Sequence, residues 1–384
     1  MIATPGRDTA RRDPSPGTGP IALFLPSLAG GGAERMMLNL AGGLAARGRP
    51  VDLVLARASG PYLDQVPSGV RVVDLDRGRV LAALARLTFY LRHTRPRALL
   101  AAMDHANIVA LWARDLAGTG TRCLVSVRSN LSAETLNGRG LAARAMPRLA
   151  RTFYRRAEAV VAVSRGVAAD LGRHLRIEPS RLHVIHNPVV TPDLPTMAAA
   201  APPHRWFAED ACRPVLLAAG RLVAQKDFPT LIRAFARVRA HHPARLVILG
   251  EGPERRSLER LTHELGVATD VDLPGFQPNP FGFFRSAALV VCSSAWEGLP
   301  GVLIQALACG TPVVSTDCRD GPREILEDGR LGRLVPVGDS LALADAILAT
   351  LTAPPARAPL IARAADFALE PITDLYLALL EGSG

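Results

Sequence analysis

The chain has a single lysine, few aromatic residues and no long apolar run. Lys226 is the only lysine among 45 basic residues, and Phe, Trp and Tyr make up 5% of the 384 residues. No segment reaches the roughly 18 uninterrupted apolar residues that span a bilayer, so any membrane contact is expected to be peripheral. The five cysteines lack paired metal-ligand spacing, which favours a reduced cytoplasmic protein over a disulfide framework. They are Cys123, Cys212, Cys292, Cys309 and Cys318.

The ends and the middle of the chain differ in composition from the rest. Residues 1–18 are rich in Pro, Gly, Arg and Asp and lack the hydrophobic centre of a secretory signal, so we expect a disordered tail. Five prolines between Asn187 and Pro214 indicate a linker. The sequence therefore predicts domains at 19–190 and 214–365, a linker at 191–213, and a helix at 366–384 that can pack back on the first domain.

Strand-like apolar runs alternate with helical patterns through both halves. Such alternation is typical of parallel sheets covered by helices, so we predict an α/β fold of two Rossmann-like, doubly wound domains. The runs include Ile21–Leu25, Val51–Leu55 and Ala98–Met103 in the first half, and Val215–Ala219, Arg245–Leu249 and Leu289–Cys292 in the second. Ligands of such sheets bind beyond the carboxyl ends of the strands, which directs attention to the loops that follow them.

Positive charge is concentrated in the first half. Residues 1–190 contain 27 arginines and 13 acidic residues, whereas residues 191–384 contain 18 basic and 22 acidic residues. This asymmetry suits an anionic partner or, alternatively, simply solvated faces. Arg139–Arg156 combines an apolar stripe of Leu141, Met146, Leu149 and Phe153 with Arg144, Arg148, Arg151, Arg155 and Arg156. It is either a helix lying on an anionic membrane or an ordinary core helix.

Three loops of the second half carry candidate donor-site residues. Gly220 and Arg221 follow a strand, and Lys226 lies five residues on, so both cations can converge on a diphosphate. A second loop contains Gly250, Glu251 and Gly252; a third contains Glu297, Gly298, Leu299, Pro300 and Gly301, with Gln305 about two turns into the next helix. Glycines permit close backbone approach, and a helix N-terminus favours phosphate. Solvated charges, an ordinary tight turn and a helix-capping acid are the structural alternatives.

The first half offers a glycine loop and two polar loops. Gly30, Gly31 and Gly32 precede a helix, but Arg35 occupies the third glycine position of a dinucleotide fingerprint, which disfavours a dehydrogenase. Asp104 and His105 follow one strand, and Arg128 and Asn130 follow the next, as candidates for the acceptor side. An ordinary structural role is the other interpretation of His105. Asp74 and Asp76 are interpreted as a solvated strand end, and no metal is predicted.

Taken together, these motifs resemble the retaining family 4 glycosyltransferases of the GT-B fold. The resemblance extends over nearly the whole chain, from Gly30–Glu34 through Ile185–Pro188 to Thr311–Val314 and the glycine at 321. It implies that Arg221 and Lys226 hold a donor diphosphate and that Glu297 contacts the transferred sugar. The family has a second glutamate where this chain has Gln305, and many relatives have a histidine where it has Arg128.

The resemblance implies an activity. We expect transfer of a sugar, with retention, from a UDP- or GDP-sugar to a hydroxyl of a glycan or lipid-linked acceptor in polysaccharide or glycolipid biosynthesis. No cofactor, metal or nucleic acid is expected, and the membrane's inner face is where any peripheral contact would occur. A sugar-nucleotide epimerase or hydrolase of the same fold and a non-catalytic sugar-nucleotide-binding protein remain alternatives.

Overall fold

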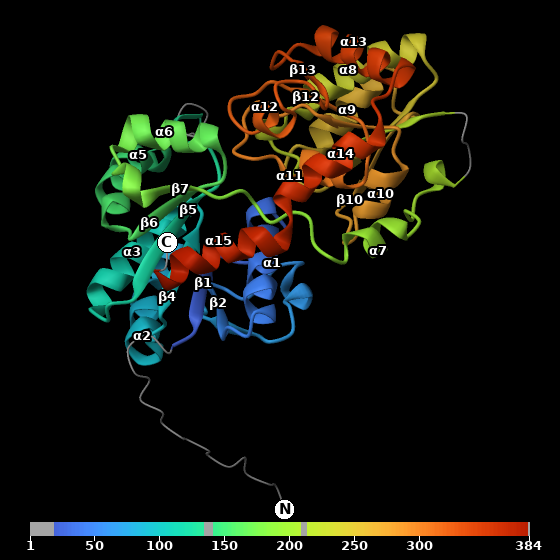
Figure 1. Cartoon of the computed structure of the whole chain (residues 1–384). Helices are drawn as coiled ribbons and strands as arrows, with labels where there is room; N and C mark the ends of the chain where they lie inside the picture. The colour runs from blue at the N-terminus through green and yellow to red at the C-terminus, as the bar shows by residue number, and fades with distance from the viewer. Residues whose placement is uncertain (1–18, 134–140, 209–212, 383–384) are drawn as a thin grey trace, which may run out of the picture.

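Two parallel β-sheets, each covered by helices, form the two halves of the protein in a computed structural model (Figure 1). The structure describes residues 19–133, 141–208 and 213–382. The predicted tail at 1–18, Cys212 and the beginning of the predicted basic helix lie outside these residues. The prediction of an α/β fold with two doubly wound sheets is confirmed.

The N-terminal sheet has seven strands in the order β3-β2-β1-β4-β5-β6-β7, all parallel. They are β1 Ile21–Leu25, β2 Val51–Leu55, β3 Val70–Asp74, β4 Ala98–Ala102, β5 Arg122–Val127, β6 Ala159–Ala162 and β7 Leu182–Val184. Every residue of β1, β2 and β4 is buried, as expected of central parallel strands with helices on both faces.

Helices cover both faces of this sheet. They are α1 Gly32–Ala46, α2 Leu84–Thr94, α3 Asp104–Ala117, α5 Leu141–Phe153 and α6 Arg165–Leu175. Helices α2, α3, α5 and α6 contact one another in series, whereas α1 contacts the last helix of the chain, α15 Leu369–Glu381.

The C-terminal sheet has six parallel strands in the order β10-β9-β8-β11-β12-β13. They are β8 Val215–Ala219, β9 Arg245–Leu249, β10 Val271–Gly275, β11 Leu289–Cys292, β12 Val313–Thr316 and β13 Arg333–Val335. The helices are α8 Phe228–His241, α9 Arg255–Glu264, α10 Phe281–Ser286, α11 Gly301–Ala308, α12 Pro322–Ile325, α13 Ser340–Thr352 and α14 Arg357–Ala364.

Alternate residues of β8 point to opposite faces of the C-terminal sheet. Leu216 and Ala218 join a core formed with α8 and α13, whereas Val215 and Leu217 join a core that continues through α11 into the N-terminal domain. The two domains thus share one continuous hydrophobic core.

The chain passes between the domains twice. The first passage, predicted as a linker, contains a helix, α7 Leu194–Ala199, which packs on α10. The second passage leads from α14 into α15, which lies across the N-terminal domain beside α1 (Figure 1). The passages pair with each other, since Val189 N and Val190 N donate to the carbonyl of Phe367 at 3.1 and 3.0 Å.

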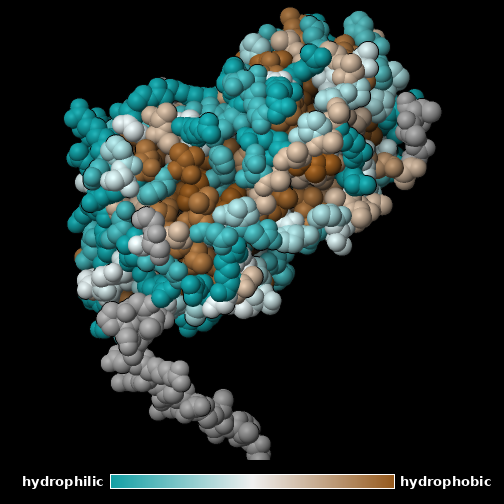
Figure 2. Space-filling model, viewed as in Figure 1, coloured by the Kyte–Doolittle hydropathy of each residue, from teal (hydrophilic) through white to brown (hydrophobic). Residues whose placement is uncertain are grey.

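The surface is mostly hydrophilic on the face shown in Figure 2, with hydrophobic residues gathered on the N-terminal domain. Among the described residues, no helix combines the length and the apolar character needed to cross a membrane.

Candidate active site in the interdomain cleft

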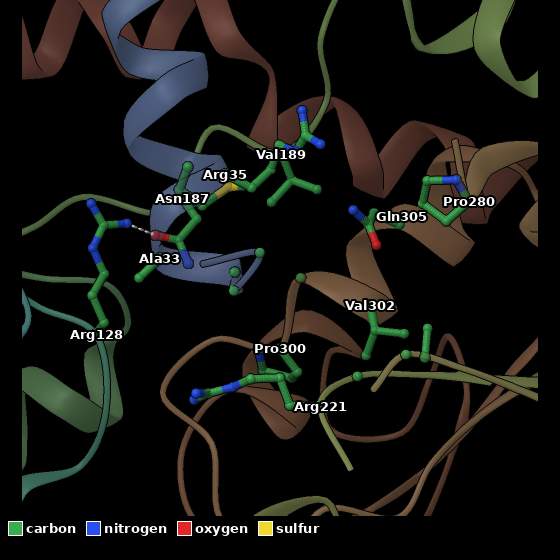
Figure 3. A pocket seen from close by; sticks show the side chains of 18 of the residues that line it. Ala33, Arg35, Arg128, Asn187, Val189, Arg221, Pro280, Pro300, Val302 and Gln305 are labelled. Carbon is green, nitrogen blue, oxygen red and sulfur yellow. Dashed lines mark hydrogen bonds between the residues drawn. The ribbon is translucent and has the colours of Figure 1, made fainter. Parts of the chain in front are cut away.

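A cavity of about 1230 Å³ lies between the two domains, at the carboxyl ends of strands from both sheets (Figure 3). This is where doubly wound folds bind ligands, and the volume exceeds what one small molecule needs. Most of the predicted site residues line it: Gly31, Gly32, Asp104, His105, Arg128, Gly220, Arg221, Lys226, Gly250, Glu251, Glu297, Leu299, Pro300, Gly301 and Gln305. Asn130, Gly252 and Gly298 do not.

Lys226 and Glu297 form an ion pair at the floor of the cavity. Ser294 Oγ also donates to Glu297 Oε1, at 2.7 Å, and Ser293 Oγ donates to the Lys226 carbonyl at 2.8 Å. Burial, the largest single effect, lowers the pKa of Lys226, but the charge and hydrogen bond of Glu297 together with Cys292 and Cys318 outweigh burial and hold that pKa above its ordinary value. The ammonium is therefore charged at neutral pH, and it is oriented by a carboxylate from the loop after β11.

Arg221 is the exposed cation of the C-terminal wall. Within the described residues its guanidinium has no hydrogen-bond or ion-pair partner. Figure 3 shows its side chain extending alongside Pro300. A solvated guanidinium beside a charged ammonium gives this wall the chemistry of an oxyanion site.

Two of the predicted ligand-contacting glycines instead support the packing of neighbouring loops. A Cβ on Gly250 would fall 2.0 Å from the Gly220 carbonyl oxygen, and one on Gly252 would fall 2.4 Å from the Leu222 oxygen. The loops after β8 and β9 therefore touch through their backbones. Gly250 also lines the cavity, whereas Gly252 does not.

Gly298 is required at a contact between the domains. A Cβ there would fall 2.1 Å from the carbonyl oxygen of Arg128. Its backbone therefore lies against the N-terminal domain, and the expected approach of a ligand to this glycine stays a prediction.

The helix after Gly298 is α11, whose first turn borders the cavity. Pro300 is the N-cap, with extended backbone at φ −69° and ψ 100°, and Gly301 is the first residue of α11. Because proline lacks an N–H, the amides available at this helix end begin with Gly301. Both residues line the cavity, so the helix N-terminus faces the cavity, as an anion-binding helix end would.

Next to the glycine loop of the N-terminal wall lies a buried glutamate, Glu34, which does not itself line the cavity and whose role the sequence did not indicate. Glu34, in the first turn of α1, is buried, and its carboxylate folds back over Gly31, where a Cβ would fall 2.5 Å from Oε2. Burial raises the pKa of Glu34, partly offset by its own backbone N–H, Arg221 and Arg128. An acid three residues after a glycine N-cap was the available signal.

Arg128 joins the N-terminal wall to the linker. It donates to Asn187 Oδ1, drawn as a dashed line in Figure 3, and its Nη2 lies 3.2 Å from the Met37 sulfur. Burial lowers the pKa of Arg128. The predicted neighbour Asn130 is fully buried and donates to Asp320 of the other domain, away from the cavity.

Asp104 and His105 lie in the first turn of α3 and line the cavity. The Asp104 carboxylate accepts a hydrogen bond from the hydroxyl of Tyr154 at 2.6 Å. Tyr154, just after α5, is thus positioned to orient Asp104 toward the cleft.

Sequence reasoning missed an aromatic part of the lining, formed by Tyr62, Phe276, Phe281, Phe284 and Trp296. Tyr62 and Phe276 approach across the cleft with ring centroids 5.8 Å apart. Arg35 lies 4.0 Å above the Tyr62 ring. No local motif marks these residues; only their places after β2, β10 and β11 could have suggested them.

The fold and the cavity define a two-domain protein of the GT-B class with its site between the domains. The structure matches that of Anabaena HepE in complex with UDP and glucose, with a TM-score of 0.78, 20% identity, and coverage of 95% of this chain and all of that one. Residues 30–192 match the family described as Glycosyltransferase Family 4, and residues 213–353 match Glycosyl transferases group 1. The chain belongs to the group 1, family 4 glycosyltransferases.

Two curated relatives match parts of the chain. The lipopolysaccharide core biosynthesis glycosyltransferase LpsE of Rhizobium meliloti is 38% identical over 172 residues, 44% of this chain and 49% of the relative. A Campylobacter jejuni enzyme, N-acetylgalactosamine-N,N'-diacetylbacillosaminyl-diphospho-undecaprenol 4-alpha-N-acetylgalactosaminyltransferase, is 34% identical over 187 residues, 48% of each chain. The chain thus spans about half the length of these relatives.

Proposed function

We propose that this protein transfers a sugar from a UDP- or GDP-sugar to a hydroxyl of a glycan or lipid-linked acceptor, with retention of the anomeric configuration. The observation that carries the proposal is that one cavity is lined by the Arg221 guanidinium, which has no partner among the described residues, by the charged Lys226 and by the start of α11. The names of the relatives support the acceptor class, since one acts in lipopolysaccharide core synthesis and another on a diphospho-undecaprenol-linked sugar. The UDP and glucose held by HepE support the donor class.

The proposed chemistry uses the positive wall of the cleft to stabilise the leaving group. As the bond from the anomeric carbon to the diphosphate breaks, negative charge grows on the phosphate oxygen. Arg221, Lys226 and the amides of α11 meet that charge, and such preorganised groups typically contribute about 100- to 1000-fold in rate each. The acceptor oxygen bonds to the anomeric carbon, and its proton leaves with the nucleoside diphosphate.

Glu297 and Gln305 are proposed to hold the donor's hydroxyls. Gln305 replaces the carboxylate found in relatives with an amide, which still accepts from a hydroxyl but without charge assistance, at a cost of roughly 1 kcal/mol of binding. We further propose that protein cations make a metal unnecessary, so that transfer persists in EDTA.

Mass spectrometry of reactions with a panel of UDP- and GDP-sugars, each with and without cell-extracted lipid acceptors, tests the activity. Transfer requires both substrates. Product formed from donor alone indicates an epimerase or hydrolase, and a donor that binds without any product indicates a sensor. Arg221→Ala should abolish most transfer, whereas Arg237→Ala, which removes an exposed guanidinium on α8, should not.

We also propose that a lipid-linked acceptor is reached by peripheral contact through α5 and the turn after it. This segment exposes Leu149 together with Arg148, Arg151, Arg155 and Arg156. Each basic residue near an anionic surface contributes about 1 kcal/mol. Cosedimentation with phosphatidylglycerol vesicles, lost in high salt and in an Arg151→Glu/Arg155→Glu variant, tests this contact.

A further inference from the structure

The two domains touch beside the cavity along what we term the interdomain seam. It consists of residues 128–130, 165–166 and 186 on the N-terminal side, and of residues 298 and 320–324 on the C-terminal side. Glu324, in α12, accepts two hydrogen bonds from the other domain. Arg165 N donates to its Oε2 at 2.8 Å, and His186 Nε2 lies 2.7 Å from its Oε1.

The Glu324 carboxylate sits at the positive end of a helix. Arg165 is the first residue of α6, and the side chain of the N-cap Ser164 accepts a hydrogen bond from the amide of Val167. Glu324 therefore accepts a hydrogen bond from the Arg165 amide, which has no partner within α6. It also places a negative charge where the helix dipole favours one. Figure 1 shows α12 on the side of the C-terminal domain that faces α6.

Asp320 forms the second part of the seam. Asn130 Nδ2 donates to its carboxylate, and a Cβ on Gly166 would fall 2.1 Å from its Oδ1. Asp320 adopts a left-handed backbone with φ +70°, which few side chains other than Asp and Asn tolerate. The residue is thus held against α6 by a contact that admits no side chain on its neighbour.

The seam is continuous with the candidate active site. A Cβ on Gly321 would fall 2.5 Å from Pro300, and Gly298 lies against the Arg128 carbonyl. Behind α12, Arg363 donates to the carbonyls of Glu324 and Ile325 at 2.7 and 3.1 Å. The segment 320–324 is therefore fixed between α14 on one side and the loop after Glu297 on the other.

We infer that Asp320 and Glu324 are positioning residues that hold the two domains together, so that the Arg128 wall and the Glu297–Gly301 loop face each other across the cavity. Neither residue lines that cavity. The inference rests on the proposed function for its catalytic consequence, but the domain contact itself can be measured without it.

The test compares Glu324→Ala, Glu324→Gln and Asp320→Ala with the wild type. Glu259→Gln is the matched control, because the ion pair that Glu259 makes among the described residues, with Arg255 at 3.1 Å, lies within its own domain. Three quantities are measured: the radius of gyration by small-angle X-ray scattering, amide hydrogen exchange at the start of α6, and kcat and KM for transfer.

We expect Glu324→Ala to expose the Arg165 amide to exchange while the Val167 amide, capped locally by Ser164, stays protected. The radius of gyration should rise, and kcat should fall by about 100-fold, the usual cost of misplacing reacting groups by 1 Å, with a smaller change in donor KM. Glu324→Gln keeps an acceptor oxygen and should restore most of kcat. Glu259→Gln should change none of the three.

Unchanged exchange at Arg165 and an unchanged radius of gyration in both alanine variants overturn the inference, whatever the activity. Lost kcat without domain opening overturns it as well, because the residues would then act by another route. If the wild type transfers no sugar, the proposed function fails, and scattering and exchange still decide the seam.

Discussion

Replacing Lys226 by methionine tests whether the ion pair with Glu297 has both a structural and a catalytic role. Methionine keeps the aliphatic stem and removes the charge. Glu297 then keeps one hydrogen bond, from Ser294, for a carboxylate whose side chain is only 9% exposed. Breaking a fully buried pair costs about 3–5 kcal/mol. Since the Lys226 side chain is 20% exposed, water can solvate part of the lost charge, and we expect about 2–3 kcal/mol.

The assay is a double-mutant cycle with Lys226→Met, Glu297→Gln and both together. At about 2–4 °C of Tm per kcal/mol for a domain of this size, Lys226→Met should lower the Tm by about 4–12 °C. The double variant should regain most of that loss, because no buried charge is left unpaired. Its turnover should remain at least about 100-fold below wild type, since the phosphate loses a cation. Arg330→Met, which removes an exposed pair with Glu327, should cost less than about 1 kcal/mol.

Two results would refute this reasoning. A Tm of Lys226→Met equal to wild type means that the pair contributes no stability. Recovered turnover in the double variant means that the ammonium matters only as a partner of Glu297, and that Arg221 and α11 alone meet the leaving group.

Three further substitutions have expected outcomes. Gly298→Ala places a methyl 2.1 Å from the Arg128 carbonyl, so the domains must separate, and turnover should fall by about 100-fold with a larger radius of gyration in scattering. Burial raises the pKa of Glu34 in the folded protein above its ordinary 4.5. The contribution of this residue to the free energy of unfolding is therefore fully present below pH 4.5 and is lost as the pH rises through the folded pKa. Glu34→Gln should therefore raise the Tm at pH 7, with a gain that shrinks toward pH 4.5; an equal gain at both pH values contradicts the assignment. Gln305→Glu should lower the donor KM by about fivefold, measured by initial rates, and an unchanged KM places the ribose elsewhere.

The fold was largely predictable because parallel strands have a strong local signal. An unbroken apolar run such as Val215–Ala219 is buried on both faces and is found as β8 with the predicted bounds. Helix α7 was missed because five prolines across the segment indicate a linker. Pro195 nevertheless lies in the first turn, where it loses no hydrogen bond, and Leu194 and Ala198 bury an apolar face.

The candidate site was predictable only as a set of loops. Glycine motifs indicated which loops reach the cleft. A glycine indicates that something lies close to the backbone, but it does not show whether that is a ligand or another part of the chain. At Gly298 the neighbour is Arg128 of the other domain, and at Gly252 it is the next loop. The pairing of Lys226 with Glu297, 71 residues apart, is likewise a tertiary contact that no local pattern contains. The aromatic lining could not be predicted from the sequence for the same reason.

We propose that the Lys226–Glu297 pair leaves groups available for a ligand rather than blocking the site. A lysine ammonium has three N–H donors, and Glu297 uses one, so two remain for phosphate oxygens. Glu297 Oε1 accepts hydrogen bonds from both Lys226 and Ser294. Within the described residues Glu297 Oε2 has no partner, so it can accept a hydrogen bond from a sugar hydroxyl. The stem of Lys226 passes over Gly220, where a Cβ would lie 3.1 Å from Cε, so the loop glycine makes room for this path. In a chain that otherwise uses arginine, a compact ammonium at this position can serve a carboxylate and a diphosphate together, whereas a planar guanidinium fork would favour pairing with the carboxylate alone.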